Sequence, residues 1–206
     1  MRVESAAKNL EAGLSHCAAD TAHHARLLIR LADINLLRNR NPEVRKNVSE
    51  SIRIAKKARS LKLEADAKYT MARLETMEGA LAEGLTQLDQ SLALYKAAGK
   101  PEGQLAVLSR MTSVYRSLSM WPQSDAINDE LLALAELEDS TSRVATALLN
   151  AAISAASRGD RSKAAEHLYR ALRICRKNGY WDLITLALID FADASSSRPE
   201  AENLDR

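Results

Sequence analysis

The chain has 206 residues, a formal net charge of +2 and a composition in which 27% of residues are charged and 4% are aromatic. This near balance of charge gives no global sign of a nucleic-acid-binding protein. No apolar run reaches the roughly 20 residues that a membrane helix needs, and the first residues lack the apolar stretch of a signal peptide. Two cysteines within helical patterns suit a reducing compartment, so we expect a soluble, cytoplasmic, helical protein.

Apolar residues recur at helical spacing along most of the chain. The first predicted helix, 4–18, resembles the second half of a repeat, because AAKNLEAGL (6–14) matches AAEHLYRAL (164–172). Proline or glycine marks several of the later helix boundaries. The further helices are expected at 21–38, 43–60, 62–78, 83–98, 101–119, 122–138, 141–157, within 159–179, and at 181–194, followed by a flexible tail at 195–206.

These helices repeat with a fixed period. Steps of forty residues from Leu172 reach Leu132, Leu92 and Ile52. Such a period is typical of a solenoid of stacked helix hairpins. Small residues share the period and would let the two helices of a hairpin approach closely. They are Ala32, Ala72, Thr112 and Ala152 on first helices, and Val44, Gly84, Ser124 and Ala164 on second helices, where Val44 is the largest.

The segment RGDRSKAAEHLYRAL (158–172) joins a Gly-Asp turn to the pattern Ala-x-x-x-Leu-x-x-Ala-Leu. It resembles the tetratricopeptide repeat (TPR) family, with long units similar to those of kinesin light chains and bacterial TPR-containing regulators. The resemblance implies an all-α fold, a right-handed α-solenoid of about nine helices. One domain over 1–194 would comprise a half repeat 4–18, repeats 21–60, 62–99, 101–138 and 141–179, and a terminal helix 181–194. Asn35, Glu75 and Ala155 stand where the family commonly has a tyrosine, and Tyr115 fits that position.

The resemblance also implies that the first helix of each hairpin lines a concave groove for a protein or peptide partner. Arginines beside apolar side chains suit an acidic, partly hydrophobic peptide, although the same arginines could instead be solvated or pair with nearby aspartates. Tyr69, Ser109 and Leu149 occupy positions where a clamp for a C-terminal carboxylate would need basic or amide groups, which argues against that clamp. The expected partner-binding residues are Arg26, Ile29, Arg30, Asp33, Tyr69, Arg73, Ser109, Arg110, Arg116, Leu149, Asn150 and Ile153.

No catalytic or metal-binding pattern occurs in the sequence. It has no phosphate-binding glycine loop, no nucleophile elbow and no His-Glu-x-x-His. His16, Cys17, His23 and His24 lack the spacing of a zinc site. We therefore expect a non-catalytic interaction module or scaffold without cofactor or metal. The alternative is the sensor or regulatory segment of a larger signalling or transcription-regulator protein, which binds an effector and controls an output domain absent here.

Charge is unevenly distributed along the chain. Basic residues are concentrated over 38–62, where only Glu43 and Glu50 oppose them locally, and acidic residues over 125–139. Without interleaved aromatic residues the basic run is not expected to bind nucleic acid, and contact between the basic and acidic ends of two copies is a further alternative. The terminal helix 181–194 is strongly apolar, which predicts self-association or burial against a partner through that helix.

Overall fold

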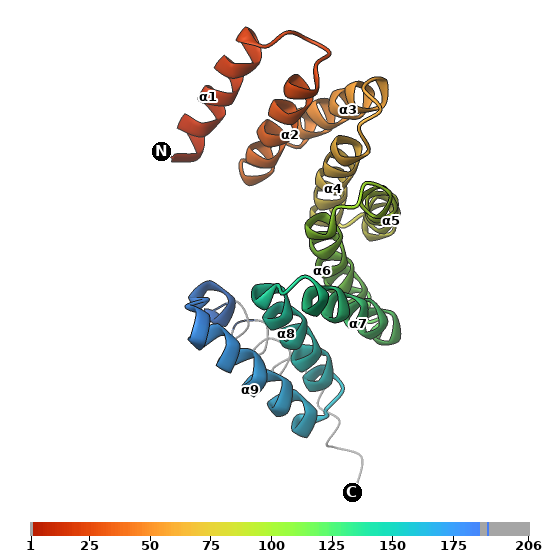
Figure 1. Ribbon diagram of the computed structural model, residues 1–206, viewed down its shortest axis with the longest axis vertical. Coiled ribbons are helices and arrows are strands. Elements are labelled where there is room, and N and C mark those ends of the chain that lie inside the picture. The colour runs from red at the N-terminus through yellow and green to blue at the C-terminus, as the bar shows by residue number, and fades with distance from the viewer. Residues whose placement is uncertain (1, 186–188, 190–206) are drawn as a thin grey trace, which may run out of the picture. The chain divides into compact units, whose positions relative to one another are not determined.

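The computed structural model describes residues 2–185 and residue 189 (Figure 1). All regular structure in these residues is α-helical, as the sequence predicts, and they contain no strand. None of the helices in this part of the chain is long and apolar enough to cross a membrane. The helices are α1 (Arg2–His16), α2 (Ala22–Leu37), α3 (Asn41–Lys57), α4 (Leu61–Met77), α5 (Leu81–Ala97), α6 (Pro101–Ser117), α7 (Trp121–Leu137), α8 (Thr141–Ser157) and α9 (Arg161–Asn178).

The helices lie close to their predicted positions. None of these helices begins more than two residues from its predicted first residue. Helix α3, for example, begins at Asn41 and holds Pro42 in its first turn, where the missing N–H of proline breaks no helical hydrogen bond. The predicted terminal helix is helical over 181–185 and at residue 189. Its other residues, and the predicted tail 195–206, lie outside the described residues.

From α2 onward, each helix ends in the same kind of turn. In α2 to α8 the residue after the cap has a positive φ, and in α9 the cap itself, Gly179, has one. The next N–H then bonds to a carbonyl five residues back, as in Ser60 N to Ala55 O (2.9 Å) and Lys100 N to Tyr95 O (3.0 Å). This pattern is the Schellman ending of a helix. It recurs every twenty residues, at Asn39, Arg59, Gly79, Gly99, Ser119, Asp139, Gly159 and Gly179. The forty-residue period is therefore two helix-and-turn segments of equal length.

Replacing Arg59 with glycine is expected to stabilise the protein. Arg59 has a φ of 51°, and a side chain in the left-handed region costs about 1 kcal/mol that glycine avoids. Urea unfolding should show a gain of about that size for Arg59→Gly. The matched control is Gly99→Ala, at a φ of 59°, which should lose a similar amount. A loss of stability in Arg59→Gly would contradict this account of the turns.

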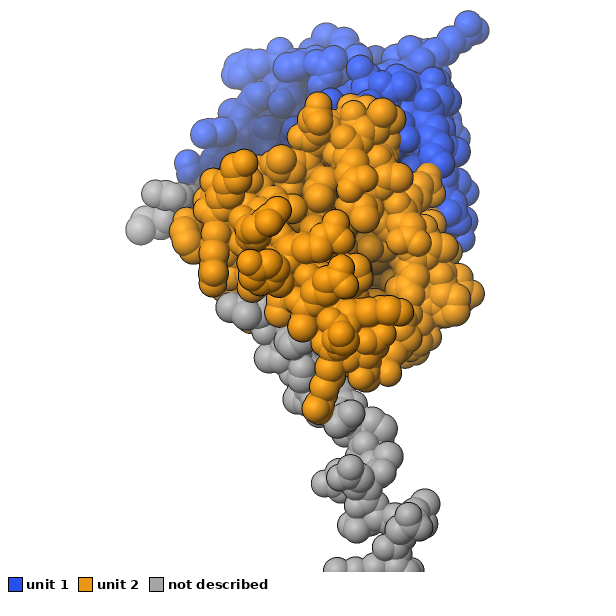
Figure 2. Space-filling view, turned by 60° about the horizontal axis from the view of Figure 1, so that its bottom comes forward, with its two compact units in different colours: residues 1–107 blue, residues 108–206 orange. Residues whose placement is uncertain are grey.

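The chain divides into two compact units, residues 1–107 and 108–206, which are blue and orange in Figure 2. In the first unit α2 packs against α3, α4 packs against α5, and α4 also packs against α2 and α3. Leu36, Val48 and Leu74 belong to the core of these hairpins. In the second unit α8 packs against both α7 and α9, with Leu148 and Ala171 buried between α8 and α9. The single domain expected over 1–194 stays a prediction.

The small residues on facing helices are buried, as expected from their period. Ser124 Oγ donates to the carbonyl of Thr112 at 3.2 Å, which joins α7 to α6 directly. A Cβ added at Gly84 would lie 2.6 Å from Cγ2 of Thr76 and 3.4 Å from the carbonyl oxygen of Ala72. These distances show that the second helix of a hairpin approaches the backbone of the first, so the small side chains set the spacing.

One ionisable side chain in α4 is buried in the interior of the hairpin. Glu75 is 9% exposed, and its Oε2 has no hydrogen-bond partner among the described residues. Burial raises the pKa of the Glu75 carboxyl, and the Arg45 guanidinium opposes that shift. Burial disfavours the ionised form of a carboxyl, so the Glu75 carboxylate destabilises this interior.

Glu75→Gln is therefore expected to raise stability at neutral pH. The pKa of Glu75 is raised in the folded state, so folding favours the protonated carboxyl. The free energy of unfolding therefore falls as the pH rises above the ordinary carboxyl pKa. The gain from Glu75→Gln should be present near pH 7 and vanish near pH 4, in urea unfolding measured at both values. Asp20→Asn is the opposite control, because Lys57 and Arg53 lower the pKa of Asp20: its loss of stability should be present near pH 7 and shrink on acidification. A gain for Glu75→Gln that does not change with pH would contradict the assignment to charge.

Candidate functional site

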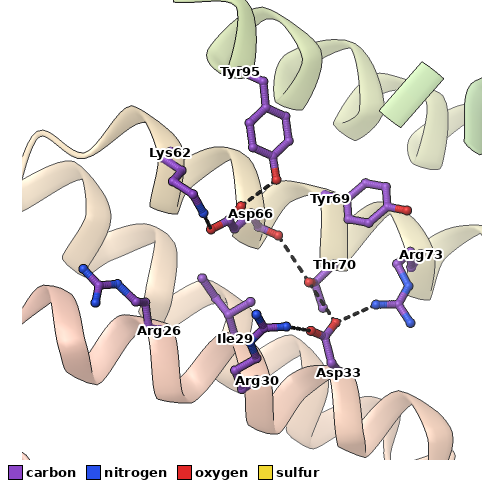
Figure 3. Close-up of a pocket in the computed structure, with 10 residues that line it drawn as sticks. All are labelled: Arg26, Ile29, Arg30, Asp33, Lys62, Asp66, Tyr69, Thr70, Arg73 and Tyr95. Atoms are coloured by element: carbon purple, nitrogen blue, oxygen red, sulfur yellow. Dashed lines mark hydrogen bonds and ion pairs between the residues drawn. The ribbon is translucent and has the colours of Figure 1, made fainter. Parts of the chain in front are cut away.

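A groove with a volume of about 340 Å³ lies in the first unit, between α2 and α4 (Figure 3). Six expected partner-binding residues line it: Arg26, Ile29, Arg30 and Asp33 of α2, and Tyr69 and Arg73 of α4. Spacings of three and four residues place each set on one face of its helix. Lys62, Asp66, Thr70 and Tyr95 complete the lining. The first helices of two successive hairpins thus supply nearly all of the groove.

Asp33 is the centre of one polar cluster in the groove. Its Oδ1 accepts from Nη1 of Arg73 at 2.6 Å and from Oγ1 of Thr70 at 3.3 Å. Nη1 of Arg30 lies 4.0 Å from Oδ2 of Asp33. Burial raises the pKa of the Asp33 carboxyl, and the charge of Arg73 opposes this shift. Asp33 therefore holds Arg73 in place and leaves Arg30 loosely engaged.

Asp66 is the centre of a second cluster. It accepts from Nζ of Lys62 at 2.7 Å and from the hydroxyl of Tyr95 at 2.6 Å. Burial and the bond to Asp66 raise the pKa of Tyr95, so the hydroxyl remains a donor. Neither Lys62 nor Tyr95 is singled out by the sequence pattern. The four-residue spacing from Lys62 to Asp66 could have indicated the ion pair, whereas Tyr95, on a second helix, reads as an ordinary core residue.

Two arginines in the groove are available to a ligand. Arg26 is exposed and forms no ion pair among the described residues. The side chain of Arg30 is 77% exposed, with only the 4.0 Å approach to Asp33. Ile29, between them on α2, is 6% exposed and supplies an apolar surface. The lining holds Arg26, Arg30, Lys62 and Arg73 against two carboxylates, so its net charge is positive.

The other six expected residues lie in the second unit. Ser109 and Arg110 of α6 are half-buried. Nη1 of Arg116 donates to Oδ1 of Asn150 at 3.5 Å, and Nδ2 of Asn150 is buried without a partner among the described residues. Leu149 and Ile153 of α8 are only 6% and 5% exposed, and Leu149 belongs to the core cluster of Leu148 and Ala171. A binding role for these six residues stays a prediction.

Most cations of the basic run at 38–62 pair with acids that the fold brings to them. Arg53 pairs with Asp20, and Lys57 Nζ lies 2.9 Å from the same carboxylate. Arg38 donates to Glu4 at 2.7 Å. Glu43 and Glu50 are the acids that oppose these cations locally in the sequence, and the fold adds acids from α1, α4 and the α1–α2 loop. Similarly, the acidic run at 125–139 is not without bases, since Arg158 pairs with Asp125.

No group of three or more His, Cys, Asp or Glu is placed to hold a metal ion within the described part of the chain. The four residues of the His/Cys segment do not form such a group. Cys17 instead lies with its Sγ 3.5 Å from Oγ1 of Thr21, which caps α2 through the amide of His24.

Helix hairpins joined by short turns, with small residues at their crossings, define a TPR-like helical repeat protein, and solved structures share this fold. No protein-family model and no curated protein matches the sequence. Aspartyl phosphate phosphatase F from Bacillus subtilis is similar over 87% of this chain, with a TM-score of 0.79 and 11% identity. A Rap protein in complex with Competence and Sporulation Factor is similar over 91%, with a TM-score of 0.78 and 14% identity. A putative kinesin light chain repeat protein from Podosopora anserina covers 86%, with a TM-score of 0.68 and 15% identity.

These structures differ from the chain in length. The chain spans 47% of the phosphatase F chain, 56% of the Rap chain and 89% of the kinesin light chain repeat protein. Identities of 11–15% establish a common fold and carry no residue-level correspondence. The TPR-like fold in general belongs to proteins that bind other proteins, which is the coarse function the likeness supports.

Proposed function

We propose that the chain is a non-catalytic interaction module, which holds an acidic, partly hydrophobic peptide segment in the groove between α2 and α4. The observation that carries the proposal is the pair of exposed arginines, Arg26 and Arg30, on either side of Ile29. Arginine binds carboxylates through paired hydrogen bonds. An apolar side chain next to a peptide carboxylate would pack against Ile29 and Tyr69.

The internal ion pairs favour a ligand of limited charge. Asp33 and Asp66 hold Arg73 and Lys62, so a peptide carboxylate meets the unpaired Arg26 and the loosely engaged Arg30, and not four available cations. The same aspartates would repel a peptide with acids along its whole length. We therefore propose a ligand with one or two carboxylates next to an apolar residue, in an extended segment of a protein partner. On this proposal the protein acts in the cytoplasm without a cofactor.

Selection from a random peptide library displayed on phage tests this function. The immobilised chain should enrich sequences in which Asp or Glu stands next to Leu, Ile or Val. The same selection on Arg26→Glu with Arg30→Glu should enrich none of these sequences. Enrichment of basic peptides, or equal enrichment on both proteins, would overturn the proposal.

A second candidate is the sensor or regulatory segment of a larger protein. It is favoured by the two neighbours of which this chain spans about half, one of them solved with a bound factor. The groove would then take an effector peptide and control an output domain. The test is to express the product of the full gene and to measure whether a library-selected peptide changes its activity. A change would favour this candidate over a simple scaffold.

Self-association through the apolar segment 181–194 stays a prediction. Trp181 is 64% exposed and Ile189 is 53% exposed, which is consistent with an uncovered apolar end. Residues 186–188 and 190–194 lie outside the described residues, and a contact through this segment would strengthen with added salt.

A further inference from the structure

Helix α9 has the most one-sided charge among the described helices. It carries one acidic residue, Glu166, and its buried side is Ala164, Ala171 and Cys175. Its cations lie on the other sides of the helix, as Lys/Arg at 161, 163, 170, 173, 176 and 177. A helix face of one charge can be a solvated surface, so the local pairing of these cations decides whether it needs a partner.

The outward face of α9 holds one acidic residue, Glu166, and several cations without an ion-pair partner among the described residues. Arg173 and Arg176 are exposed and form no ion pair in the described part of the chain, unlike Arg53 and Lys57 of α3. Tyr169, one and two turns before them on the same side, is 70% exposed. We call Tyr169, Arg173 and Arg176 the basic stripe. It presents two unpaired guanidinium groups next to an uncovered aromatic ring.

Helix α7 carries acidic residues on the equivalent face, and one equivalent pair, Glu136 and Arg176, is of opposite charge. Forty residues before the basic stripe stand Asp129, Ala133 and Glu136, all exposed, which we call the acidic stripe. Asp129 and Glu136 form no ion pair among the described residues. The buried residues of α7 keep the same offset, with Ser124, Leu131 and Ala135 preceding Ala164, Ala171 and Cys175 by forty residues. Both stripes therefore point away from the core of their own hairpins.

We infer that the two stripes are the halves of a contact between two copies of this chain, in which the basic stripe of one copy binds the acidic stripe of the other. This goes beyond the peptide groove, which lies in the other unit. Both stripes span seven residues, or two helical turns. In antiparallel contact Asp129 would face Arg176 and Glu136 would face Tyr169, while Ala133 leaves room for Arg173.

The charge pattern favours a second copy over a nucleic acid. A polyanion would use the basic stripe alone, whereas the acidic stripe of the same length and register would repel it. A second copy uses both stripes at once. Leu137, 77% exposed at the end of α7, adds an apolar group next to the acidic stripe, as Tyr169 does in the basic stripe. Exposed ion pairs are individually weak, so the contact should be sensitive to salt.

Sedimentation of the full chain measures the contact. At about 0.01 M ionic strength, where the screening length is about 30 Å, the wild type should associate, and at about 1 M, where it is about 3 Å, it should be monomeric. The basic-stripe variant is Arg173→Glu with Arg176→Glu, and the acidic-stripe variant is Asp129→Arg with Glu136→Arg. Each alone should associate at least about tenfold more weakly than wild type. These positions are exposed, and circular dichroism confirms that helicity is kept.

Mixing the two variants decides the assignment. An equimolar mixture should associate like wild type, because the reversed stripe of one variant then meets the reversed stripe of the other. A chain with all four substitutions should associate too. A wild type that stays monomeric at low salt, a variant that associates as wild type does, or a mixture that stays monomeric would each overturn the inference. If added salt strengthens association and the substitutions have no effect, the contact lies in the apolar segment 181–194. If wild-type chains bind an RNA homopolymer but not each other, the basic stripe is a site for a polyanion.

Discussion

Arg26→Glu with Arg30→Glu is expected to weaken the binding of a library-selected acidic peptide about 100-fold, since each hydrogen-bonded charge contributes about 1.5 kcal/mol or more. Arg26 is unpaired and Arg30 is held only at 4.0 Å from Asp33. Their loss therefore breaks little within the protein, and their reversal adds repulsion. Fluorescence anisotropy of the labelled peptide measures the change, and the urea unfolding midpoint should stay near that of the wild type.

The matched control for net charge is Lys8→Glu with Lys46→Glu. Both lysines are exposed on α1 and α3 and neither lines the groove. This control makes the same change in net charge, so it should weaken binding only slightly, and less so at higher salt. If both double variants bind equally weakly, the effect comes from the long-range field of the protein, and the site is not the groove.

Gly103→Leu is expected to cost about 3 kcal/mol of stability and to disturb the groove from outside it. A Cβ at Gly103 would lie 2.3 Å from Cδ1 and from Cε1 of Tyr95. The ring has little room to move, because Tyr95 is 6% exposed and its hydroxyl donates to Asp66 at 2.6 Å. Moving the ring would also break that bond, which helps to hold Asp66 against Lys62. The better helix propensity of leucine offsets less than about 1 kcal/mol.

A double-mutant cycle identifies the cause of that loss. Gly103→Leu in a Tyr95→Ala background should cost much less than in the wild type, because the clash partner is gone, with a coupling of about 1–3 kcal/mol. Tyr95→Phe keeps the ring and removes only the hydroxyl, so it should cost about 1–2 kcal/mol. Additive losses in the cycle would show that Gly103 is constrained by something other than Tyr95.

The helices and their pairing could be predicted because they depend on local patterns. The apolar residues at helical spacing and the forty-residue period place the helices to within a few residues, and the period predicts hairpins whatever the side chains on their outer faces. The turns were predicted only in part. Gly99, Gly159 and Gly179 mark helix ends by composition, whereas Arg59 and Ser119 adopt the same left-handed conformation without a residue type that announces it.

The groove shows where a family resemblance stops being informative. The resemblance predicts which face of α2 and α4 is turned towards a ligand, and six residues of that face line one cavity. It does not predict that Arg73 is engaged by Asp33 or that Tyr95 reaches the groove from a second helix. These partners are 40 and 29 residues apart in sequence, and a match in side-chain length and direction decides whether they meet.

The sequence by itself determines that this protein is an all-helical repeat, because helical periodicity, small residues and turns act over a few residues and recur at a fixed interval. Only the tertiary structure decides which charges are free. The cations of the basic run 38–62 that approach Glu4, Asp20 and Asp66 are neutralised, while Arg26 in the groove, and Arg173 and Arg176 on α9, form no ion pair among the described residues, and Arg30 has only a 4.0 Å approach to Asp33. The reason is that an ion pair requires a distance of about 4 Å or less between the charged groups. The packing between helices sets that distance, and the order of residues along the chain does not.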